Sequence, residues 1–355
     1  MKNKAAKSAS VWTLVGAWAV VGWGSPAWAQ FKCGNVFVAE APHACQGGIL
    51  PPYDTDLIWE LDTRTREARI FAFVPYELCG HITGLAFTPD GTRLRASSYY
   101  RSEIIEFDSK GNLTTALGPA DGIACPSGRN NLAYDAQGNF YVANGCGSKI
   151  LRFPADGGPG TVFTSGTGAL IAIAFVPDGD LYFTSILNNS GRLMRVTPDG
   201  TATEFDNYGT TTHGITLTND RRGYIYVGLR NRQILRYRAG DPASKTVLVP
   251  AGPWATIYSI AMSADQSLLY VHSYHKAYAI DVLSGSYTTL VEFFTPMREG
   301  FTGGIAVAPS MPCVSMASAW SLNALALVMF AAGTAAILWH MRSSRAVPGG
   351  PVRIV

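Results

Sequence analysis

The sequence predicts an all-β fold, a six-bladed β-propeller closed by its own two ends, from its composition, a long internal repeat and a split final blade. Of 355 residues, 37 are glycine and 16 each are tyrosine and phenylalanine, and only 15% are charged. This mixture is typical of a tightly turned β protein. Internal repeats then decide the architecture.

A motif of a small residue, Ile or Leu, Ala and a Gly-containing turn recurs along the chain. Clear copies begin at Gly84 (GLAFTPDG), Asn131 (NLAYDAQG) and Ala172 (AIAFVPDG), and looser ones at Gly214 and Ser259. The apolar residues that we align are Leu85, Leu132, Ile173, Ile215 and Ile260, spaced by 47, 41, 42 and 45 residues. That period is the length of one four-stranded blade.

Each copy continues with three more strands in a fixed order. An aromatic strand follows the turn (NFYVAN, DLYFTS, YIYVGL, LLYVHS), then a third strand (EIIEFD, KILRFP, RLMRVT, QILRYR, KAYAID), then a fourth (NLTTAL, GTVFT, GTATEF, KTVLV, SYTTLVEF). Alternation with a period of two between Gly, Asp and Asn turns is typical of strands in short hairpins. Five complete blades result.

The sixth blade is split between the two ends of the repeat region. Residues 303–309 (GGIAVAP) provide a first strand, and residues 34–40 (GNVFVAE), 57–62 (LIWELD) and 67–73 (EARIFAF) provide the second, third and fourth. We expect them to pair as blade one, because closing the ring hides the sheet edges that an open array exposes. The propeller then spans residues 30–313.

Six cysteines suit a disulfide-bonded protein of an exported compartment. Cys33 precedes the second strand of blade one and Cys313 follows its first strand, so we expect a Cys33–Cys313 disulfide to lock the ring. The other four lie in loops on one face, and we favour the pairs Cys45–Cys79 and Cys125–Cys146 among the three patterns that four cysteines allow. Metal binding by these four is the alternative, but they lack close CxxC spacing.

Both ends of the chain predict export and anchoring. Residues 1–29 contain three lysines, an apolar run and Ala27-Trp28-Ala29, the pattern of a signal peptide; an uncleaved anchor is the alternative. Residues 319–339 carry no charge over 21 positions, and Arg342 and Arg345 follow. This pattern indicates a transmembrane helix with a cytoplasmic C-terminus, rather than a buried core helix.

The predicted domains are therefore a signal peptide (1–29), the propeller (30–313), a tether and transmembrane helix (314–341) and a basic cytoplasmic tail (342–355). We expect the propeller in the periplasm, held at a bacterial inner membrane. Residues 314–320 (VSMASAW) are also similar to a sorting motif, which would imply removal of the tail by a sorting enzyme.

Charge argues against nucleic acid as a partner. The formal net charge is +3, but six of the 28 basic residues lie in the first ten and last fourteen positions. The remaining 22 face 25 acidic residues, so the middle of the chain is slightly acidic. Such a domain has no basic footprint for nucleic acid.

The repeat resembles the NHL class of propellers and, more loosely, the gluconolactonase/senescence-marker and virginiamycin B lyase propellers, over residues 30–313. Residues 212–215 (THGI) are similar to the Pro-His-Gly-Ile of lyase blades, and residues 182–185 (YFTS) to their Trp-Phe-Thr-Glu, without the glutamate. The gluconolactonase resemblance implies a divalent cation, Ca²⁺ or Mg²⁺, at the mouth of the central channel, held by carboxylate and amide oxygens.

Candidate ligands for that cation stand where second strands end: Glu40, Ser97, Asn144, Ser185, Leu229 and Ser273. Glu40 and Asn144 offer suitable oxygens, and Glu40 is also a candidate general base. The third ligand that the resemblance implies, an aspartate from a later blade, is absent from this set. His81 and His213 precede first strands and are candidates for proton transfer or metal binding. The structural alternatives are that Glu40 pairs with a nearby base and that each histidine hydrogen-bonds a neighbouring loop.

Two functions follow. The first is a binding or scaffold module that grips a protein, peptide or glycan on the face turned away from the membrane. The longest loop, residues 41–56, and the residues Tyr99, Tyr100 and Arg101 belong to that surface. The second is a metal-dependent hydrolase or lyase that uses Glu40, Asn144 and a histidine. The sequence contains no Ser-His-Asp arrangement and no nucleotide-binding fingerprint.

Overall fold

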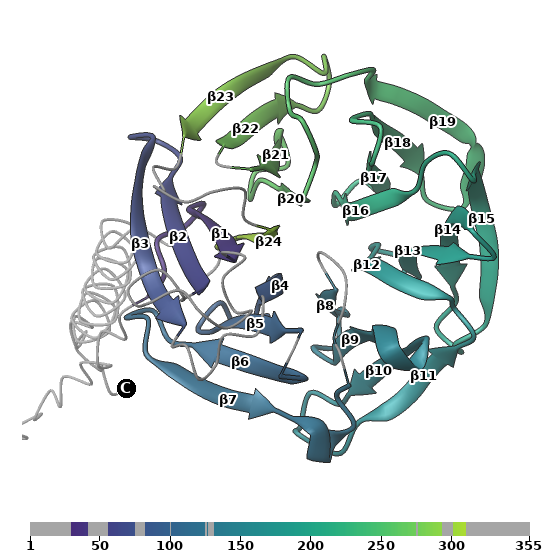
Figure 1. Ribbon diagram of the computed structural model, residues 1–355, viewed down its shortest axis with the longest axis horizontal. Coiled ribbons are helices and arrows are strands. Elements are labelled where there is room, and N and C mark those ends of the chain that lie inside the picture. Colours follow the sequence, from purple (N-terminus) through teal and green to yellow (C-terminus); the bar gives the residue numbers. More distant parts are fainter. Residues whose placement is uncertain are drawn as a thin grey trace, which may run out of the picture.

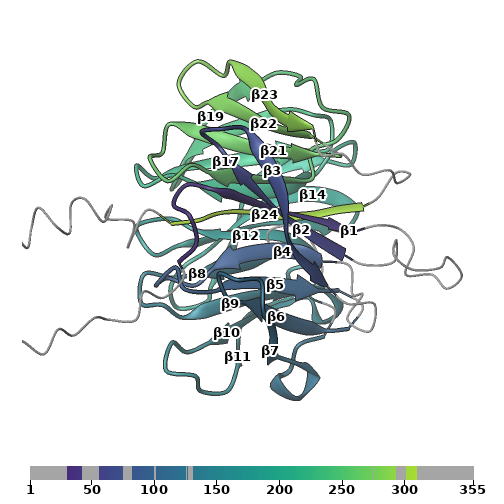
Figure 2. The ribbon, with the colours of Figure 1, turned by 90° about the vertical axis from the view of Figure 1, so that its left-hand side faces the viewer.

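The computed structural model describes residues 30–41, 56–74, 82–99, 101–124, 126, 131–274, 276–292 and 301–309. In these ranges the chain forms six four-stranded antiparallel sheets around a central axis (Figure 1). The predicted six-bladed propeller is confirmed. Figure 2 shows the same ring edge-on.

Each blade is a meander whose first strand is innermost (Figure 1). Blade one contains β24 (Phe301–Val307), β1 (Val36–Ala41), β2 (Asp56–Asp62) and β3 (Glu67–Val74). Blade two contains β4 (Ile82–Phe87), β5 (Leu94–Ser98), β6 (Glu103–Phe107) and β7 (Leu113–Leu117). Blade three contains β8 (Leu132–Tyr134), β9 (Phe140–Asn144), β10 (Lys149–Phe153) and β11 (Thr161–Ser165).

Blade four contains β12 (Ala169–Phe175), β13 (Leu181–Leu187), β14 (Ser190–Val196) and β15 (Ala202–Gly209). Blade five contains β16 (Gly214–Asn219), β17 (Tyr224–Leu229), β18 (Ile234–Arg238) and β19 (Asp241–Val249). Blade six contains β20 (Ser259–Met262), β21 (Leu268–Ser273), β22 (Lys276–Asp281) and β23 (Tyr287–Glu292). Among the described residues, two short 3₁₀ helices, η3 (Pro119–Asp121) and η4 (Gly145–Gly147), lie in connections.

The ring closes as predicted, by pairing the last described strand with the first. β24 runs antiparallel to β1, with Val307 opposite Val36 and Ile305 opposite Val38. The Gly34 amide donates to the Ala308 carbonyl at 3.1 Å, which extends the pairing beyond the strands. Blade one is thus assembled from both ends of the repeat region.

Cys33 stands just before this closure and is disulfide-bonded. Its predicted partner, Cys313, lies outside the described residues, so the Cys33–Cys313 pair stays a prediction. The pairs Cys45–Cys79 and Cys125–Cys146 also involve residues outside the described ranges. The predicted signal peptide (1–29), the predicted transmembrane segment 319–339 and His81 lie outside them as well. Within the described residues, no helix is long and apolar enough to cross a membrane.

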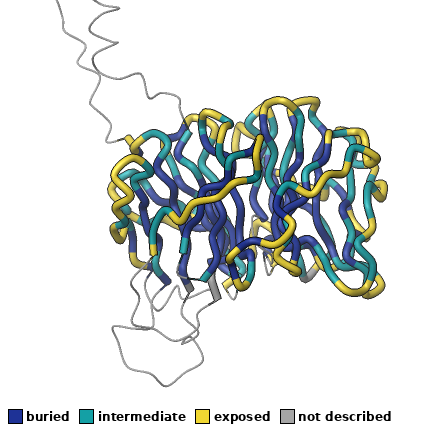
Figure 3. Tube along the Cα trace, turned by 90° about the horizontal axis from the view of Figure 1, so that it is seen from above, coloured by how far each residue is buried: buried dark blue, intermediate teal, exposed yellow. Residues whose placement is uncertain are grey.

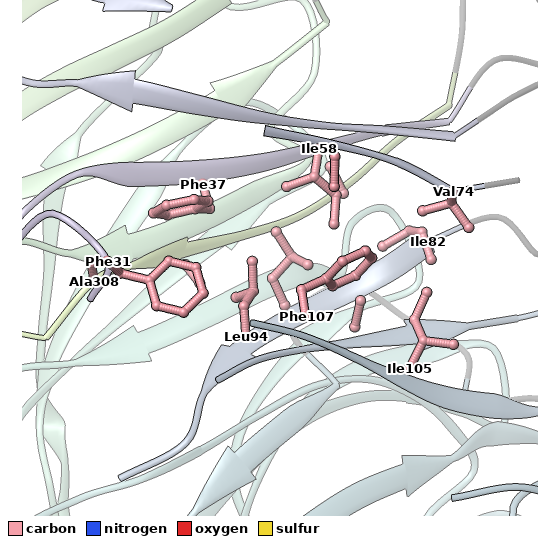
Figure 4. Packing of buried hydrophobic residues seen from close by; sticks show 14 residues of the cluster. Phe31, Phe37, Ile58, Val74, Ile82, Leu94, Ile105, Phe107 and Ala308 are labelled. Atoms are coloured by element: carbon pink, nitrogen blue, oxygen red, sulfur yellow. The ribbon is translucent and has the colours of Figure 1, made fainter. Parts of the chain in front are cut away.

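The hydrophobic core consists of the seams between neighbouring blades. Alternation along β1 sends Phe37 toward blade two, where it packs with Phe107, and sends Val38 toward blade six, where it packs with Tyr270. Figure 4 shows the seam between blades one and two, in which Phe31 joins the cluster. In Figure 3, most of the buried segments are strands inside the ring, and most of the exposed segments are connections at its two faces.

The propeller has two faces with different connections. Turns that join first to second strands and third to fourth strands, such as residues 88–93 and 154–160, form one face, which we call the turn face. Connections between second and third strands, such as residues 230–233, and connections between blades form the opposite one, the loop face. The loop face is the one that we expected to bind a partner.

The strand register corrects one of the alignments made from sequence. Leu217 pairs with Val227, which lies two residues before the end of β17, just as Leu85 pairs with Ala96, two residues before the end of β5. Leu217 therefore holds the repeat position that we assigned to Ile215. Both residues are apolar, and glycine or threonine flanks each of them, so the pattern alone does not separate them.

A second correction concerns blade two. Ser98, not Ser97, is the last residue of β5 and corresponds to Asn144 at the end of β9. Ser97 points to the other face of the blade, where its hydroxyl donates to Asn131 Oδ1 at 2.8 Å across the seam to blade three. The assignment shifted by one position because two serines follow each other here and blade two has no aromatic residue to fix the alignment.

Candidate functional site

Glu40, the predicted cation ligand or base, is buried in the body of blade one. Its side chain is 5% exposed, and its Oε2 accepts a hydrogen bond from Trp59 Nε1 at 2.8 Å. Trp59 itself lies opposite Val38, on the side of the blade that faces blade six. The carboxylate is therefore an internal acceptor for an indole N–H.

The side chain of Asn144, the second predicted ligand, forms hydrogen bonds with the backbone. Its side chain is 2% exposed. Its Oδ1 accepts from the Ala124 amide at 2.8 Å, and its Nδ2 donates to the Gly122 carbonyl at 3.0 Å. Both bonds fasten the connection between blades two and three, which contains η3, to the end of β9. Each end of the amide is thus used in a structural contact.

The residues at the equivalent position of the other second strands share this environment, although in blade four that position, Ser185, lies two residues before the end of β13. All are buried at 3% exposure or less: Ser98, Ser185, Leu229 and Ser273. Leu229 belongs to the hydrophobic seam that blades four and five share. The whole set therefore lies among packed side chains of the blades.

His213 is half-buried in the connection between blades four and five. Its carbonyl accepts from the Arg230 amide at 3.0 Å, and a Cβ added to Gly191 would lie 2.5 Å from its Cα. Glu40, Asn144 and His213 thus belong to blades one and three and to the entry of blade five, which are not neighbours. Over the described part of the chain, no three His, Cys, Asp or Glu side chains are grouped closely enough to hold a metal ion.

The described part of the loop face presents basic and aromatic side chains. Arg230 and Arg232 are exposed in the turn between β17 and β18. Arg101 is 39% exposed, and its Nε lies 3.4 Å from Glu103 Oε2. Tyr99 is half-buried beside it. Most of the predicted binding loop, residues 42–55, lies outside the described residues.

A different feature, which the motif search missed, sits in the seams. One residue of each second strand, at an equivalent position of the repeat, faces the next blade, and in five blades it is aromatic: Phe37, Tyr141, Tyr182, Tyr226 and Tyr270. Blade two has Arg95 at this position. The sequence already indicates this difference, because the second strands of blades three to six share an aromatic motif and the second strand of blade two lacks the aromatic residue.

The tyrosines at this position fill their seams and bind turns with their hydroxyls. Tyr141 donates to Asp135 Oδ2 at 3.0 Å, Tyr226 donates to Asp220 Oδ2 at 3.1 Å, and Tyr182 accepts from the Gly240 amide at 2.8 Å. Burial, together with the nearby Asp135 carboxylate, raises the pKa of Tyr141 to about 12. These phenols therefore stay neutral at physiological pH.

Arg95 leaves its seam unfilled. Its guanidinium carbon lies 4.7 Å from the centre of the Phe140 ring and 5.8 Å from that of Tyr134, and its Nε donates to Glu106 Oε2 at 2.9 Å. Beside it, a cleft of about 390 Å³ opens between blades two and three. Its apolar walls are formed by Pro89, Leu117, Tyr134, Phe140, Phe153 and Pro154.

Comparison with known proteins supports the fold alone. No protein-family model matches the chain, and no curated protein is significantly similar to it in sequence. A chain of a nidogen/laminin complex superposes with a TM-score of 0.62 at 16% identity, over 78% of this chain and 99% of that one. TolB from Acinetobacter baumannii superposes with a TM-score of 0.56 at 14% identity, over 78% of this chain and 67% of that one.

A virginiamycin B lyase from Staphylococcus aureus superposes less well. Its TM-score is 0.46 at 20% identity, over 61% of this chain and 71% of the lyase. That likeness is too distant to indicate an activity. The expected resemblance to six-bladed propellers is thus confirmed for the architecture.

Proposed function

We propose that this chain is an extracytoplasmic, membrane-anchored propeller that acts as a binding or scaffold module, with a protein, peptide or glycan held on its loop face. The observation that carries the proposal is the internal use of Glu40 and Asn144. Glu40 Oε2 accepts a hydrogen bond from Trp59, and Asn144 Oδ1 accepts one from the Ala124 amide, which supports a structural use of both side chains and hence a binding module over a metal enzyme.

Two further points support a binding role. The loop face carries exposed cationic side chains, Arg230 and Arg232, on a rigid β scaffold, and such loops are where propellers and other scaffolds carry recognition. The best-superposed propeller reported above belongs to a complex with a protein partner. The uncharged segment 319–339 supplies the anchor in this proposal.

Photo-crosslinking in the native cell tests the binding role. A benzophenone amino acid at position 230, on the loop face, is expected to give a discrete adduct, because a bound partner lies against that face. The matched control places the same residue at Lys110, an exposed turn-face position. Adducts from position 110 with none from position 230 would overturn the assignment of the binding face.

Metal analysis tests the enzymatic alternative. We expect the purified full chain to contain no stoichiometric Ca²⁺, Mg²⁺ or Zn²⁺ that depends on Glu40. A bound metal that is lost in Glu40→Ala but kept in Glu103→Ala would instead establish Glu40 as a ligand and favour the hydrolase or lyase function. Glu103 is a suitable control because its carboxylate pairs with Arg101 at the surface.

A further inference from the structure

The seam between blades two and three departs from the rest of the ring. In the other five seams, an aromatic side chain of the second strand packs against the following blade, as Tyr141 does with Phe175 at a centroid distance of 4.6 Å. In this seam the equivalent residue is Arg95, and its guanidinium lies over Phe140. The space that an aromatic ring occupies in the other five seams is an open cleft in this one.

We propose that this cleft binds a single aromatic ring, the phenyl or phenol group of a ligand, which completes the seam as the built-in aromatic residues do elsewhere. The site lies on the turn face and goes beyond the proposed function, which concerns the loop face. Its mouth is formed by the turns at residues 88–90 and 154–158, and Phe140 and Phe153 form its buried floor.

The walls favour an aromatic ring over other apolar groups. Phe140, Phe153 and the half-buried Tyr134 offer ring faces and edges, against which an aromatic ligand gains more than its buried area alone supplies. The Arg95 side chain is 23% exposed, and its planar guanidinium can stack on a second ring. Pro89 and Pro154 add flat apolar surfaces at the mouth.

Charge in the cleft favours a neutral ring. Arg95 is already paired with Glu106, whose other oxygen lies 3.7 Å from Arg93 Nε. Asp90, at the mouth, accepts hydrogen bonds from Thr88 and Thr92 within its own turn. Arg95 thus has a carboxylate partner and Asp90 has hydroxyl partners within the protein, so a charged ligand would gain little. The volume, about 390 Å³, is at the lower end for small-molecule pockets and suits one substituted ring.

Fluorine NMR on the full chain in detergent tests the proposal. The probes are 4-fluorophenol, N-acetyl-4-fluorophenylalanine amide and, as the non-aromatic comparison, N-acetyl-5,5,5-trifluoroleucine amide. We expect at least one aromatic probe to bind, and the trifluoroleucine probe to bind at least tenfold more weakly. Binding of the phenol alone identifies a free aromatic molecule as the ligand, and binding of the amide identifies an aromatic side chain of a peptide.

Arg95→Tyr is the decisive variant, because it restores the residue type of the other seams and fills the cleft from within. We expect binding to fall at least tenfold while the unfolding temperature stays the same or rises. Arg238→Tyr, at an exposed position on β18, is the matched control and should bind as the native chain does. The control also accounts for probe that partitions into the detergent.

A second variant protects the test if Arg95→Tyr fails to fold. Ala155→Trp changes an exposed residue at the mouth and should block entry without touching the floor. Unchanged binding in whichever of these two variants folds would overturn the proposal. So would equal binding of the trifluoroleucine probe, or the absence of any aromatic binding to the native chain beyond the detergent background.

Discussion

Single polar side chains form hydrogen bonds between neighbouring blades of this propeller. Thr216 Oγ1 accepts from the Ile260 amide at 3.1 Å, which joins blade five to blade six, and Asp56 Oδ2 accepts from the Ile82 amide at 3.2 Å, which joins blade one to blade two. Buried polar groups require such partners, because a buried donor or acceptor without a hydrogen bond costs more free energy than the hydrogen bond itself contributes. Asn144 likewise bonds the connection between blades two and three, whereas the Glu40–Trp59 bond lies within blade one.

The Glu40–Trp59 bond leads to a prediction for a single substitution. Trp59→Phe keeps most of the ring but removes the N–H that reaches the buried carboxylate at 2.8 Å. We expect it to lower the free energy of unfolding by about 1–3 kcal/mol, because a buried acceptor loses a donor. Urea unfolding measures the change. Tyr287→Phe, which removes a hydroxyl from a side chain that is 45% exposed, is the control and should be near neutral. Equal stability of both variants would contradict a structural role for Glu40.

Strands were predictable where their pattern is regular. The aromatic alternating segments of blades three to six gave the second strands, because period-two burial is encoded directly in the residues. Blade two lacks the aromatic residue, and there the alignment slipped from Ser98 to Ser97. The cleft beside Arg95 was not predicted, because it depends on how a guanidinium packs across a seam, which neither propensity nor spacing specifies.

The innermost strands carry a prediction at the scale of one element. A Cβ added to Gly304 of β24 would lie 2.4 Å from the Leu85 amide nitrogen on β4, so the two strands approach too closely for any side chain. We expect Gly304→Ala to cost about 1–3 kcal/mol, as overpacking does, and to lower the unfolding temperature. Gly118→Ala is the matched control, because no atom lies within 4 Å of its added Cβ. A Gly304→Ala protein as stable as the control would show that blades one and two can separate without penalty.

At the scale of the whole molecule, the closed ring was predictable, whereas the burial of the candidate site residues was not. Counting strands leaves one first strand at the end of the repeat region and three others at its start, and only their pairing removes the open edges. The candidate residues were chosen by their place at the ends of second strands. Their side chains point into the seams, and that orientation depends on blade packing that a single repeat does not reveal.

The closure of the ring leads to a prediction about the Cys33–Cys313 disulfide. The Ala308 amide donates to the Asn35 carbonyl at 2.9 Å, which places the end of β24 beside the disulfide-bonded Cys33. Cys313 follows Pro309 by four residues, a span of about 14 Å at most. We therefore expect non-reducing peptide mapping to find Cys33 linked to Cys313.

Loss of that bond should loosen the whole ring, because blade one would then be held only by its strand pairing and its seams. The Cys33→Ser/Cys313→Ser double variant is expected to lower the free energy of unfolding by about 2–5 kcal/mol, as removal of a native disulfide does in small secreted domains. The double variant is preferred to Cys33→Ser alone, because a single free Cys313 thiol can exchange with the remaining disulfides. Denaturant unfolding of the native chain with and without reductant provides the comparison. Free thiols at both positions in the native chain, or a peptide that links Cys33 to any other cysteine, would show that the ring is closed by strand pairing without a covalent latch between its ends.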